Sequence, residues 1–399
     1  MLKRTLPYAL AQFFTVALQW MTLLYLPLYL SDLGLSDSRL GTLISIFSLA
    51  TLVSVLPLGI LADRLPPRPM MLVGALVSAL ANLYLPRAAG FPGLALGVFV
   101  DGLGFTLSSI ALYSLFFKQV ATDRRGLEIS IFAIGGNLGA GAGAWSCGQL
   151  IGLAGYGVIF ALGAAFALAW AGFALLLPRT RGIAFPILEY GQDLKRGRAW
   201  VLIAIFFVTA SHAGFEQAGY GLLQRQVLHL SDSAIGGMFM ALGIWMAIVT
   251  AWSGRRCDRE PRPVLMCAIA LLVSGAFMAA SGSARSGAEF LFYRVLHTTG
   301  DAVFGLLILM LAASIFPKRR AGGAFAFAIT VNTTSYFVFA NLAGVVGQEY
   351  GFDSSFHLAG LIEFAGGLLL LLFRRRLARL FAGETGAEPA FRATPYTEI

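Results

Sequence analysis

Twelve long apolar stretches follow one another along the chain, and they restrict its possible folds more than any other feature. Charged residues make up only 12% of the chain, against roughly 25% in a typical soluble domain. A soluble fold of this size could not bury so much apolar surface, whereas lipid accommodates it directly. The sequence therefore predicts an all-α integral membrane protein with twelve transmembrane helices. A window of about 20 residues places them at 6–30, 40–62, 69–86, 91–118, 127–153, 156–177, 199–227, 234–253, 263–281, 287–314, 321–346 and 354–373.

Basic residues are distributed unevenly between the two sides of the predicted membrane. The termini and every second loop hold 24 of the 29 Lys and Arg residues, and the other five are Arg39, Arg87, Arg225, Arg285 and Arg294. Because cytoplasmic loops carry an excess of Lys and Arg, we expect both termini in the cytoplasm. The chain is expected to be a multi-pass protein of the plasma membrane, or of the inner membrane if bacterial. The net charge of +9 is then a topology signal, and no nucleic-acid partner is expected.

The chain contains an internal repeat in which the second copy begins 195 residues after the first. The segment LSDSRLG at 35–41 recurs as LSDSAIG at 230–236. Gly59, Asp63, Arg64 and Pro66 recur as Gly254, Asp258, Arg259 and Pro261. We therefore expect two six-helix bundles related by pseudo-two-fold symmetry. The predicted parts are an N-terminal bundle at 1–177, a cytoplasmic linker at 178–198, a C-terminal bundle at 199–376 and a polar, disordered cytoplasmic tail at 377–399.

The loop between the second and third predicted helices resembles a known family signature. The segment GILADRLPPR at 59–68 is similar to the signature loop of the major facilitator superfamily, with Pro66 and Pro67 replacing a glycine and a basic residue. The segment 254–262 resembles its degenerate second copy, and the glycine-rich stretch from Asn137 resembles the fifth helix of the family. The resemblance covers essentially the whole chain and implies the major facilitator fold.

This resemblance implies a transport mechanism of alternating access, in which the two bundles rock around a central site near the bilayer midplane. In the family, the Asp and Arg of the signature loop help to close the inner gate. The resemblance assigns that gating role to Asp63 and Arg64, and in the second copy to Asp258 and Arg259.

Three ionisable residues form a stripe on the predicted helix at 287–314. Arg294, His297 and Asp301 are spaced i, i+3, i+7 and therefore share one face. Placing a charged group inside a membrane costs free energy, so a charged residue there indicates a functional or structural role. A guanidinium, an imidazole and a carboxyl group on one stripe favour proton coupling. The stretch also resembles the tenth helix of lactose permease, with Arg in place of Lys and the acid one residue further along. The alternative is structural pairing with neighbours.

A second ionisable pair lies on the predicted helix at 199–227. His212 and Glu216 are spaced i, i+4, with Gln217 and Tyr220 close in sequence. The family resemblance places this helix against the central cavity, so we assign His212 and Glu216 to proton coupling and Gln217 and Tyr220 to substrate binding. The alternative is a mutually satisfied structural pair or a gating contact. A zinc site would need a third ligand that the sequence does not supply, so no metal is expected.

Asp101 is a lone carboxylate in the predicted helix at 91–118. It could bind a polar or cationic substrate group, carry a proton, or pair with Arg294 across the cavity, and these three roles stay open. Further substrate contacts, each with helix packing as its alternative, are predicted at Gln19, Asn137, Trp145, Asn332 and Tyr336. Glu363 is assigned a structural role.

These features lead to a ranked set of function hypotheses. The first is a secondary active transporter that couples symport of a small polar organic solute to protons, similar to the branch that includes sugar, nucleoside and phenylpropionate carriers. The alternative is a proton-driven exporter of drugs or organic cations. A third is a non-transporting scaffold or sensor. Enzymatic activity is not expected, because the chain lacks a nucleophile–base set, a metal motif and a nucleotide-binding loop. No cofactor is expected, and we expect a monomer whose partners are protons, a small-molecule substrate and the lipid bilayer.

Overall fold

The computed structural model describes residues 2–119, 125–178, 197–259, 262–315 and 321–383. Within these ranges the chain forms twelve α-helices and no β-strand, and each α-helix corresponds to one predicted apolar run. In the first half they are α1 (Leu2–Asp32), α2 (Asp37–Arg64), α3 (Pro67–Tyr84), α4 (Gly90–Gln119), α5 (Arg125–Ala154) and α6 (Gly157–Ala174). In the second half they are α8 (Gly197–Leu222), α9 (Asp232–Arg259), α10 (Pro263–Gly282), α11 (Gly287–Ile315), α12 (Ala321–Tyr350) and α13 (Phe352–Gly383). A short 3₁₀ turn, η1 (Leu85–Arg87), follows α3, and a π-helical turn, η2 (Leu223–Val227), follows α8.

Apolar composition and turn residues determine where these helices run. Judged on the described residues, nine helices are long and apolar enough to cross a membrane. The other three, α5, α8 and α11, all line the central cavity described below. After α1 the chain reverses at Gly34, whose φ of 80° favours glycine.

Helix α13 continues past the boundary predicted from hydropathy. The predicted tail began at residue 377, yet the helix extends to Gly383, and residues 384–399 lie outside the described part. The apolar run ends near Phe373, but Arg, Leu and Ala are strong helix formers and continue the helix beyond it. Most of the predicted linker, 179–196, also lies outside the described residues.

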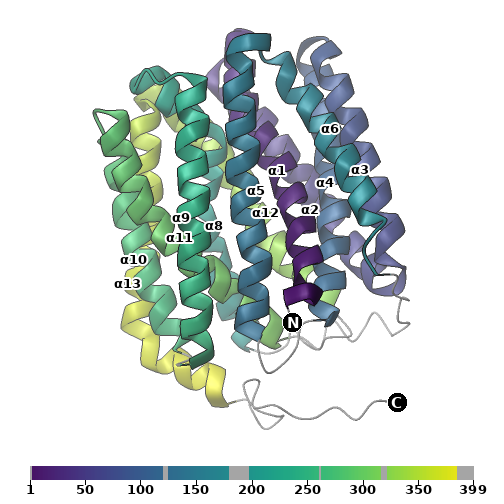
Figure 1. The fold of residues 1–399 in the computed structure, drawn as a ribbon. Coiled ribbons are helices and arrows are strands. Elements are labelled where there is room, and N and C mark those ends of the chain that lie inside the picture. Colours follow the sequence, from purple (N-terminus) through teal and green to yellow (C-terminus); the bar gives the residue numbers. More distant parts are fainter. Residues whose placement is uncertain (1, 120–124, 179–196, 260–261, 316–320, 384–399) are drawn as a thin grey trace.

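The helices form two groups of six that lie side by side (Figure 1). In the first half α3 packs against α4 and α6, and α1 packs against α5. The second half repeats these contacts, since α10 packs against α11 and α13, and α8 packs against α12. This matching set of contacts confirms the predicted twelve-helix fold of two related bundles.

Two helix pairs, α5 with α9 and α2 with α12, make the most extensive contacts between the halves. At the crossing of α2 and α12, a Cβ atom at Gly41 would lie 2.9 Å from the carbonyl oxygen of Ala340 and 3.1 Å from the Cα atom of Gly344. Glycine is therefore needed for this close approach, as in many membrane-helix crossings. The halves are thus joined along two seams, with the remaining helices around a central space.

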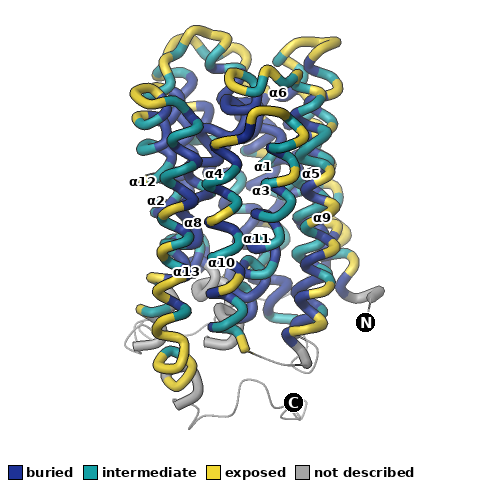
Figure 2. Tube along the Cα trace, turned by 90° about the vertical axis from the view of Figure 1, so that its left-hand side faces the viewer, coloured by how far each residue is buried: buried dark blue, intermediate teal, exposed yellow. Residues whose placement is uncertain are grey.

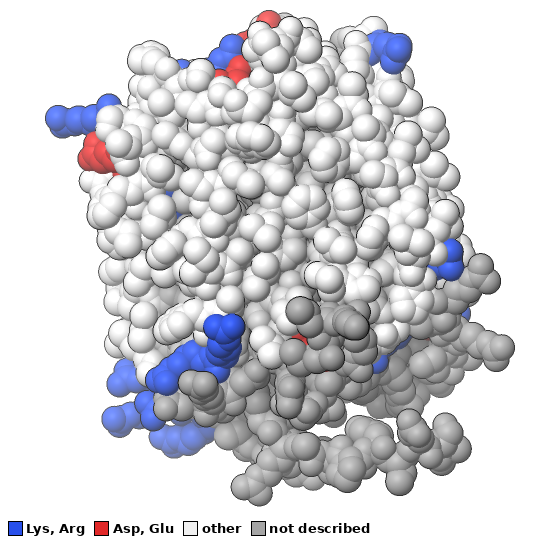
Figure 3. All heavy atoms as spheres, in the orientation of Figure 1, with Lys and Arg blue, Asp and Glu red and all other residues white. Residues whose placement is uncertain are grey.

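The start of α1 and the end of α13 lie at the same end of the molecule, here called the terminal end (Figure 1). Charged side chains gather toward the two ends, and the face between them is almost uncharged (Figure 3). Exposed positions lie on the outward faces and at the ends (Figure 2). Buried apolar side chains form two clusters: one includes Tyr8 and Phe116 near the terminal end, and the other includes Leu30 and Phe352 near the opposite end.

Candidate functional site

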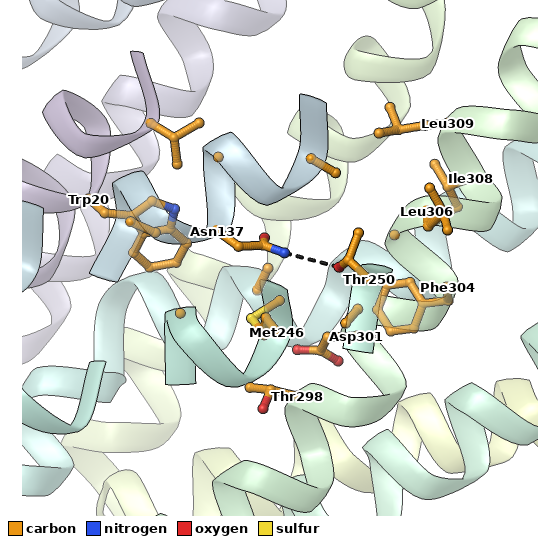
Figure 4. Close-up of a pocket in the computed structure, with 18 of the residues that line it drawn as sticks. Trp20, Asn137, Met246, Thr250, Thr298, Asp301, Phe304, Leu306, Ile308 and Leu309 are labelled. Carbon is orange, nitrogen blue, oxygen red and sulfur yellow. Dashed lines mark hydrogen bonds between the residues drawn. The ribbon is translucent and has the colours of Figure 1, made fainter. Parts of the chain in front are cut away.

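A cavity of about 400 Å³ lies between the two halves at mid-depth. Helices α1, α5, α8, α9, α11 and α12 supply most of its wall. Its polar lining residues are Gln12, Tyr113, Asn137, Thr209, His212, Glu216, Thr250, Arg294, Thr298, Asp301, Asn332 and Tyr336. One hydrogen bond crosses between the halves here, from Asn137 Nδ2 to Thr250 Oγ1 at 3.1 Å (Figure 4). All the titratable carboxyl, imidazole and guanidinium groups of this cavity lie on α8 and α11, in the second half.

These groups belong to a larger buried network, here called the ionic cluster, which lies between four helices. Its members are His212 and Glu216 on α8, Ser274 on α10, Arg294, His297 and Asp301 on α11, and Glu363 on α13. Arg294 donates to Glu216 in a buried ion pair. The stripe predicted on α11 and the pair predicted on α8 thus meet in one network. His297 and Glu363 are fully buried behind the cavity wall.

The hydrogen bonds of His297 identify which of its ring nitrogens carries a proton. Its Nδ1 lies 2.9 Å from the backbone carbonyl oxygen of Ser274, which can only accept, so Nδ1 is the donor. Its Nε2 lies 3.2 Å from a Glu216 oxygen and 2.9 Å from an Asp301 oxygen. A bare nitrogen lone pair facing two carboxylates would be repelled by both. The arrangement therefore requires a further proton, on Nε2 or on one of the two carboxyl groups.

His212 faces carboxylates with both of its ring nitrogens. Its Nε2 lies 3.6 Å from Asp301 Oδ2, and its Nδ1 lies 3.3 Å from Glu363 Oε1. A neutral imidazole has only one N–H, so both contacts are favourable only when the ring or one carboxyl group holds an additional proton. Ser274 completes the cluster by donating its hydroxyl to Asp301 at 2.6 Å.

The charges of the ionic cluster balance only when protons are bound. Three carboxylates face one guanidinium, which leaves two net negative charges when both imidazoles are neutral. Two protons bring the total to zero. Because uncompensated charge is costly at a buried site, the geometry favours a cluster that holds protons.

Arg294 is fixed in place by packing on three sides. It is 2% exposed, its guanidinium carbon lies 5.1 Å from the centre of the Tyr220 ring, and its Nη1 contacts Met278 sulfur at 3.1 Å. The cation–π contact and the ion pair to Glu216 together stabilise a charge that lipid would not tolerate. Tyr220 therefore supports Arg294 and does not line the central cavity.

A second, smaller cavity of about 190 Å³, here called the side chamber, lies between α1, α2, α4, α8 and α12. It shares the lining residues Tyr113, Asn332 and Tyr336 with the central cavity. Its other lining residues are Gln19, Phe47, Ser48, Thr51, Phe105, Thr106, Ser109, Ile110, Gln217, Ile329 and Thr333. Hydroxyl and amide groups supply its polar surface.

The predicted substrate contacts divide into two groups. Gln19, Gln217, Asn332 and Tyr336 line the side chamber, and Asn137 lines the central cavity. Three others, Tyr220, Asp101 and Trp145, line neither space.

Asp101 and Trp145 lie in surroundings that differ from the prediction. The Asp101 carboxylate is buried and accepts from Asn82 Nδ2 of α3 at 3.3 Å, so it is turned away from the cavities. No ion pair between Asp101 and Arg294 is present in the described part of the chain, which corrects one of the three open roles. Trp145 is 47% exposed on α5 and is not part of either cavity wall.

The predicted gate residues lie at the terminal end. Asp63 is fully buried and forms an ion pair with Lys118 at 2.8 Å, and Ser114 donates to it at 3.3 Å. This contact joins α2 to α4 within the first half. Arg64 is exposed at the end of α2. In the second copy, the side chains of Asp258 and Arg259 lie outside the described residues.

The opposite end is sealed by contacts between the halves that the sequence did not reveal. The Tyr25 hydroxyl lies 3.1 Å from the carbonyl oxygen of Ala144 and 3.0 Å from that of Asp232. Glycine at 236 allows this approach, because a Cβ atom there would lie 2.7 Å from the Tyr25 hydroxyl. The contact with Asp232, here called the seal, thus joins α1 of the first half to α9 of the second half at this end.

An ionic contact reinforces this seal nearer the surface. Arg225 contacts both carboxylate oxygens of Asp32 at 3.2 Å and donates to the Tyr156 hydroxyl. Tyr156 in turn donates to the Asp232 carboxylate at 3.3 Å. Burial, followed by the negative charge of Asp232, raises the pKa of Tyr156, so the phenol remains a donor. The internal repeat gave no signal for this contact, because the position equivalent to Arg225 is Leu30.

Glu363 and Ser274 are members of the ionic cluster that sequence reasoning did not place there. Glu363 was assigned a structural role, and the structure places it 3.3 Å from His212, inside the cluster. The sequence signal that could have identified Glu363 as a functional residue is an acidic residue inside an apolar run. Ser274 carries no such signal, because serine is common in membrane helices.

The ligand atoms of His212, Glu216 and His297 lie within 4.8 Å of one another, close enough by distance to hold a metal ion. A second group of three shares His212. However, the guanidinium of Arg294 already contacts the Glu216 carboxylate and places a fixed positive charge there. This charge opposes a metal cation at the same oxygen, so we interpret the cluster as a proton-binding network.

Comparisons with known proteins agree with this architecture. The family model of the Major Facilitator Superfamily matches residues 8–288 and 205–396. A curated relative, the 3-(3-hydroxy-phenyl)propionate transporter of Escherichia coli (strain K12), is 31% identical over 152 residues, and the match spans only 37% of this chain and 37% of the relative. The crystal structure of the human organic anion transporter MFSD10 (TETRAN) matches with a TM-score of 0.73 and 16% identity, covering 92% of this chain and 98% of that chain. The structural match concerns the fold alone.

Proposed function

The chain belongs to the major facilitator superfamily and is a transporter, and we propose that it couples the symport of a small polar organic solute to protons. The ionic cluster is the observation that carries this proposal. Two imidazoles each face two carboxylates, and two protons are needed to neutralise the cluster. Asp301, Glu216 and His212 also line the central cavity, so proton binding and substrate binding share one wall.

The way the two halves are joined supports a mechanism of alternating access. The seal of Tyr25 and Arg225 lies at the opposite end, and the central cavity lies between this seal and the terminal end. We propose that rocking of the bundles breaks this seal and closes the terminal end, where Asp63 and Arg64 lie. Basic residues gather at the terminal end, which supports a cytoplasmic location for both termini. We further propose a monomer in the plasma membrane, or the inner membrane if bacterial.

Two features guide the substrate class. The central cavity combines titratable groups with aromatic and amide side chains, which fits a small polar solute. The curated relative is named as a transporter of a hydroxyphenyl propionate. Aromatic carboxylic acids are therefore the first compounds to test, ahead of sugars and nucleosides.

A thermal-stability screen of the purified protein in detergent tests this function. The panel contains aromatic carboxylic acids, sugars, nucleosides and lipophilic cations, each at pH 6 and pH 8. A ligand that binds the folded state raises the unfolding midpoint by mass action. The proposal expects polar solutes to raise the midpoint with a shift that depends on pH. A response confined to lipophilic cations would contradict it.

One observation favours a second function, a proton-driven exporter of drugs or organic cations. The ionic cluster carries two net negative charges when it is deprotonated, and a cation could replace the protons. This alternative predicts tighter binding of lipophilic cations at pH 8 than at pH 6, whereas the symporter predicts no such preference.

A further inference from the structure

The side chamber differs chemically from the central cavity that it adjoins. Among the described residues that line it, none is Asp, Glu, Lys, Arg or His. Its polar wall consists of hydroxyl and amide groups, including Ser48, Ser109, Gln217 and Thr333. A charged ligand group would find no counter-charge there. The chamber therefore fits an uncharged part of a ligand.

Three buried polar atoms of the chamber lining have no hydrogen-bond partner within the described part of the protein. They are Ser109 Oγ on α4, Gln217 Oε1 on α8 and Asn332 Oδ1 on α12. Ser109 and Gln217 are 5% and 6% exposed. Buried polar groups almost always find a partner, so three in one small space call for a ligand or water. Two of them are amide oxygens, which accept hydrogen bonds, so the missing partner has to supply donors.

The shape and the remaining walls of the chamber favour a ring. Phe47 and Phe105 lie with their ring centroids 5.8 Å apart at an angle of 39°, and Tyr113 and Tyr336 complete the aromatic wall. The volume of about 190 Å³ equals the liquid volume of roughly six water molecules. A single ring with its substituents fills such a space, and aromatic walls favour an aromatic ring.

We propose that the side chamber is the subsite for a phenolic ring, whose hydroxyl groups donate to Ser109, Gln217 and Asn332. This proposal rests on the function proposed above and specifies the substrate class as an aromatic compound with a hydroxylated ring and a separate ionisable group. Tyr113, Asn332 and Tyr336 line both spaces, so such a molecule can extend from the chamber into the central cavity. Its ionisable group then faces Glu216 and Asp301, and its ring lies apart from any charge.

Binding of neutral ring compounds tests the subsite without any proton gradient. Resorcinol, phenol and fluorobenzene offer two, one and no hydroxyl donors on rings of similar size. Their affinities for the purified protein in detergent are measured by ligand-observed NMR. We expect affinity to fall in the order resorcinol, phenol, fluorobenzene. Equal affinity for resorcinol and fluorobenzene, or no binding by any of the three, would overturn the proposal.

Two neighbouring serines provide a matched pair of variants. Ser109→Ala removes the unpartnered hydroxyl and should weaken resorcinol binding about two- to tenfold. Ser108→Ala should leave it unchanged, because Ser108 Oγ donates to the Met71 carbonyl at 3.3 Å and does not line the chamber. Equal effects of the two substitutions would overturn the proposal.

A further variant and ligand keep the test decisive. If Ser109→Ala does not fold, Gln217→Met removes an unpartnered amide oxygen of the chamber with little change of side-chain length, and the same weakening is expected. Tighter binding of the polyol myo-inositol than of resorcinol would also contradict a phenolic subsite. These measurements use equilibrium binding alone, so a failure of proton coupling leaves them interpretable. A failure of ring binding likewise leaves the symport proposal standing.

Discussion

Replacing Asp301 by asparagine should reduce proton coupling while the cavity keeps its shape. Asp301 accepts from Ser274 at 2.6 Å and lies 2.9 Å from His297 Nε2. Asparagine retains an acceptor for Ser274, and its amide group can donate to Nε2 of His297 when that nitrogen carries no proton. The two carboxylates that remain, opposite Arg294, need one proton for neutrality, whereas the native cluster needs two.

The expected decrease in substrate accumulation follows from the number of coupled protons that the variant loses. A pH difference of one unit supplies about 1.4 kcal/mol for each coupled proton, which is tenfold in a concentration ratio. In proteoliposomes with an imposed difference of one pH unit, Asp301→Asn should lower the steady-state accumulation of substrate about tenfold per proton lost. Exchange of labelled for unlabelled substrate, which needs no net proton movement, should continue.

A matched control is available at Asp353, in the first turn of α13 and outside both cavities. Asp353→Asn makes the same chemical change and should leave the accumulation ratio unaltered. Native accumulation in Asp301→Asn would refute the assignment of Asp301 to proton coupling. Loss of both accumulation and exchange would instead assign Asp301 to substrate binding.

Three further predictions concern the gates and the outer surface. Tyr25→Phe removes the hydroxyl that contacts the Asp232 carbonyl, so exposure of the cavity from the opposite end should rise about two- to tenfold. Maleimide labelling of a cysteine introduced in the cavity measures this exposure, because the native cysteines are buried. Unchanged labelling would count against the seal. Asp63→Asn should lower the free energy of unfolding by about 1–3 kcal/mol in thermal or denaturant unfolding, because Lys118 loses its ion-pair partner. Adding Lys118→Met should recover part of the loss, and no recovery would contradict the pairing. Trp145→Ala should change substrate affinity less than twofold in a binding titration, because this residue lines neither cavity; a tenfold loss would require that it contacts substrate.

The fold was predictable because membrane helices leave two strong signals in the sequence. Apolar runs mark each span, and the repeated segments at 35–41 and 230–236 mark the start of α2 and α9. Hydropathy reports on the lipid environment alone, which is why it ended α13 too early. A run of arginines interrupts the apolar stretch without interrupting the helix.

The ionic cluster was predictable only in part, because spacing along one helix is visible in sequence and packing between helices is not. The stripe of Arg294, His297 and Asp301 follows from helical periodicity. The contact of this stripe with Glu216, and that of His212 with Glu363, depend on how α8, α11 and α13 pack, which no local pattern records. The same reason explains why Asp101 was expected in the cavity, although its carboxylate faces α3.

Proton movement driven by substrate distinguishes proton-coupled symport from the other modes of transport. Purified protein is reconstituted in liposomes that contain a pH-sensitive dye, without an initial pH difference, and the best ligand of the screen is added outside. The proposed symport predicts that the interior becomes more acidic as substrate enters, and that Asp301→Asn reduces this change. An interior that becomes more alkaline, or substrate entry without any pH change, would contradict proton-coupled symport.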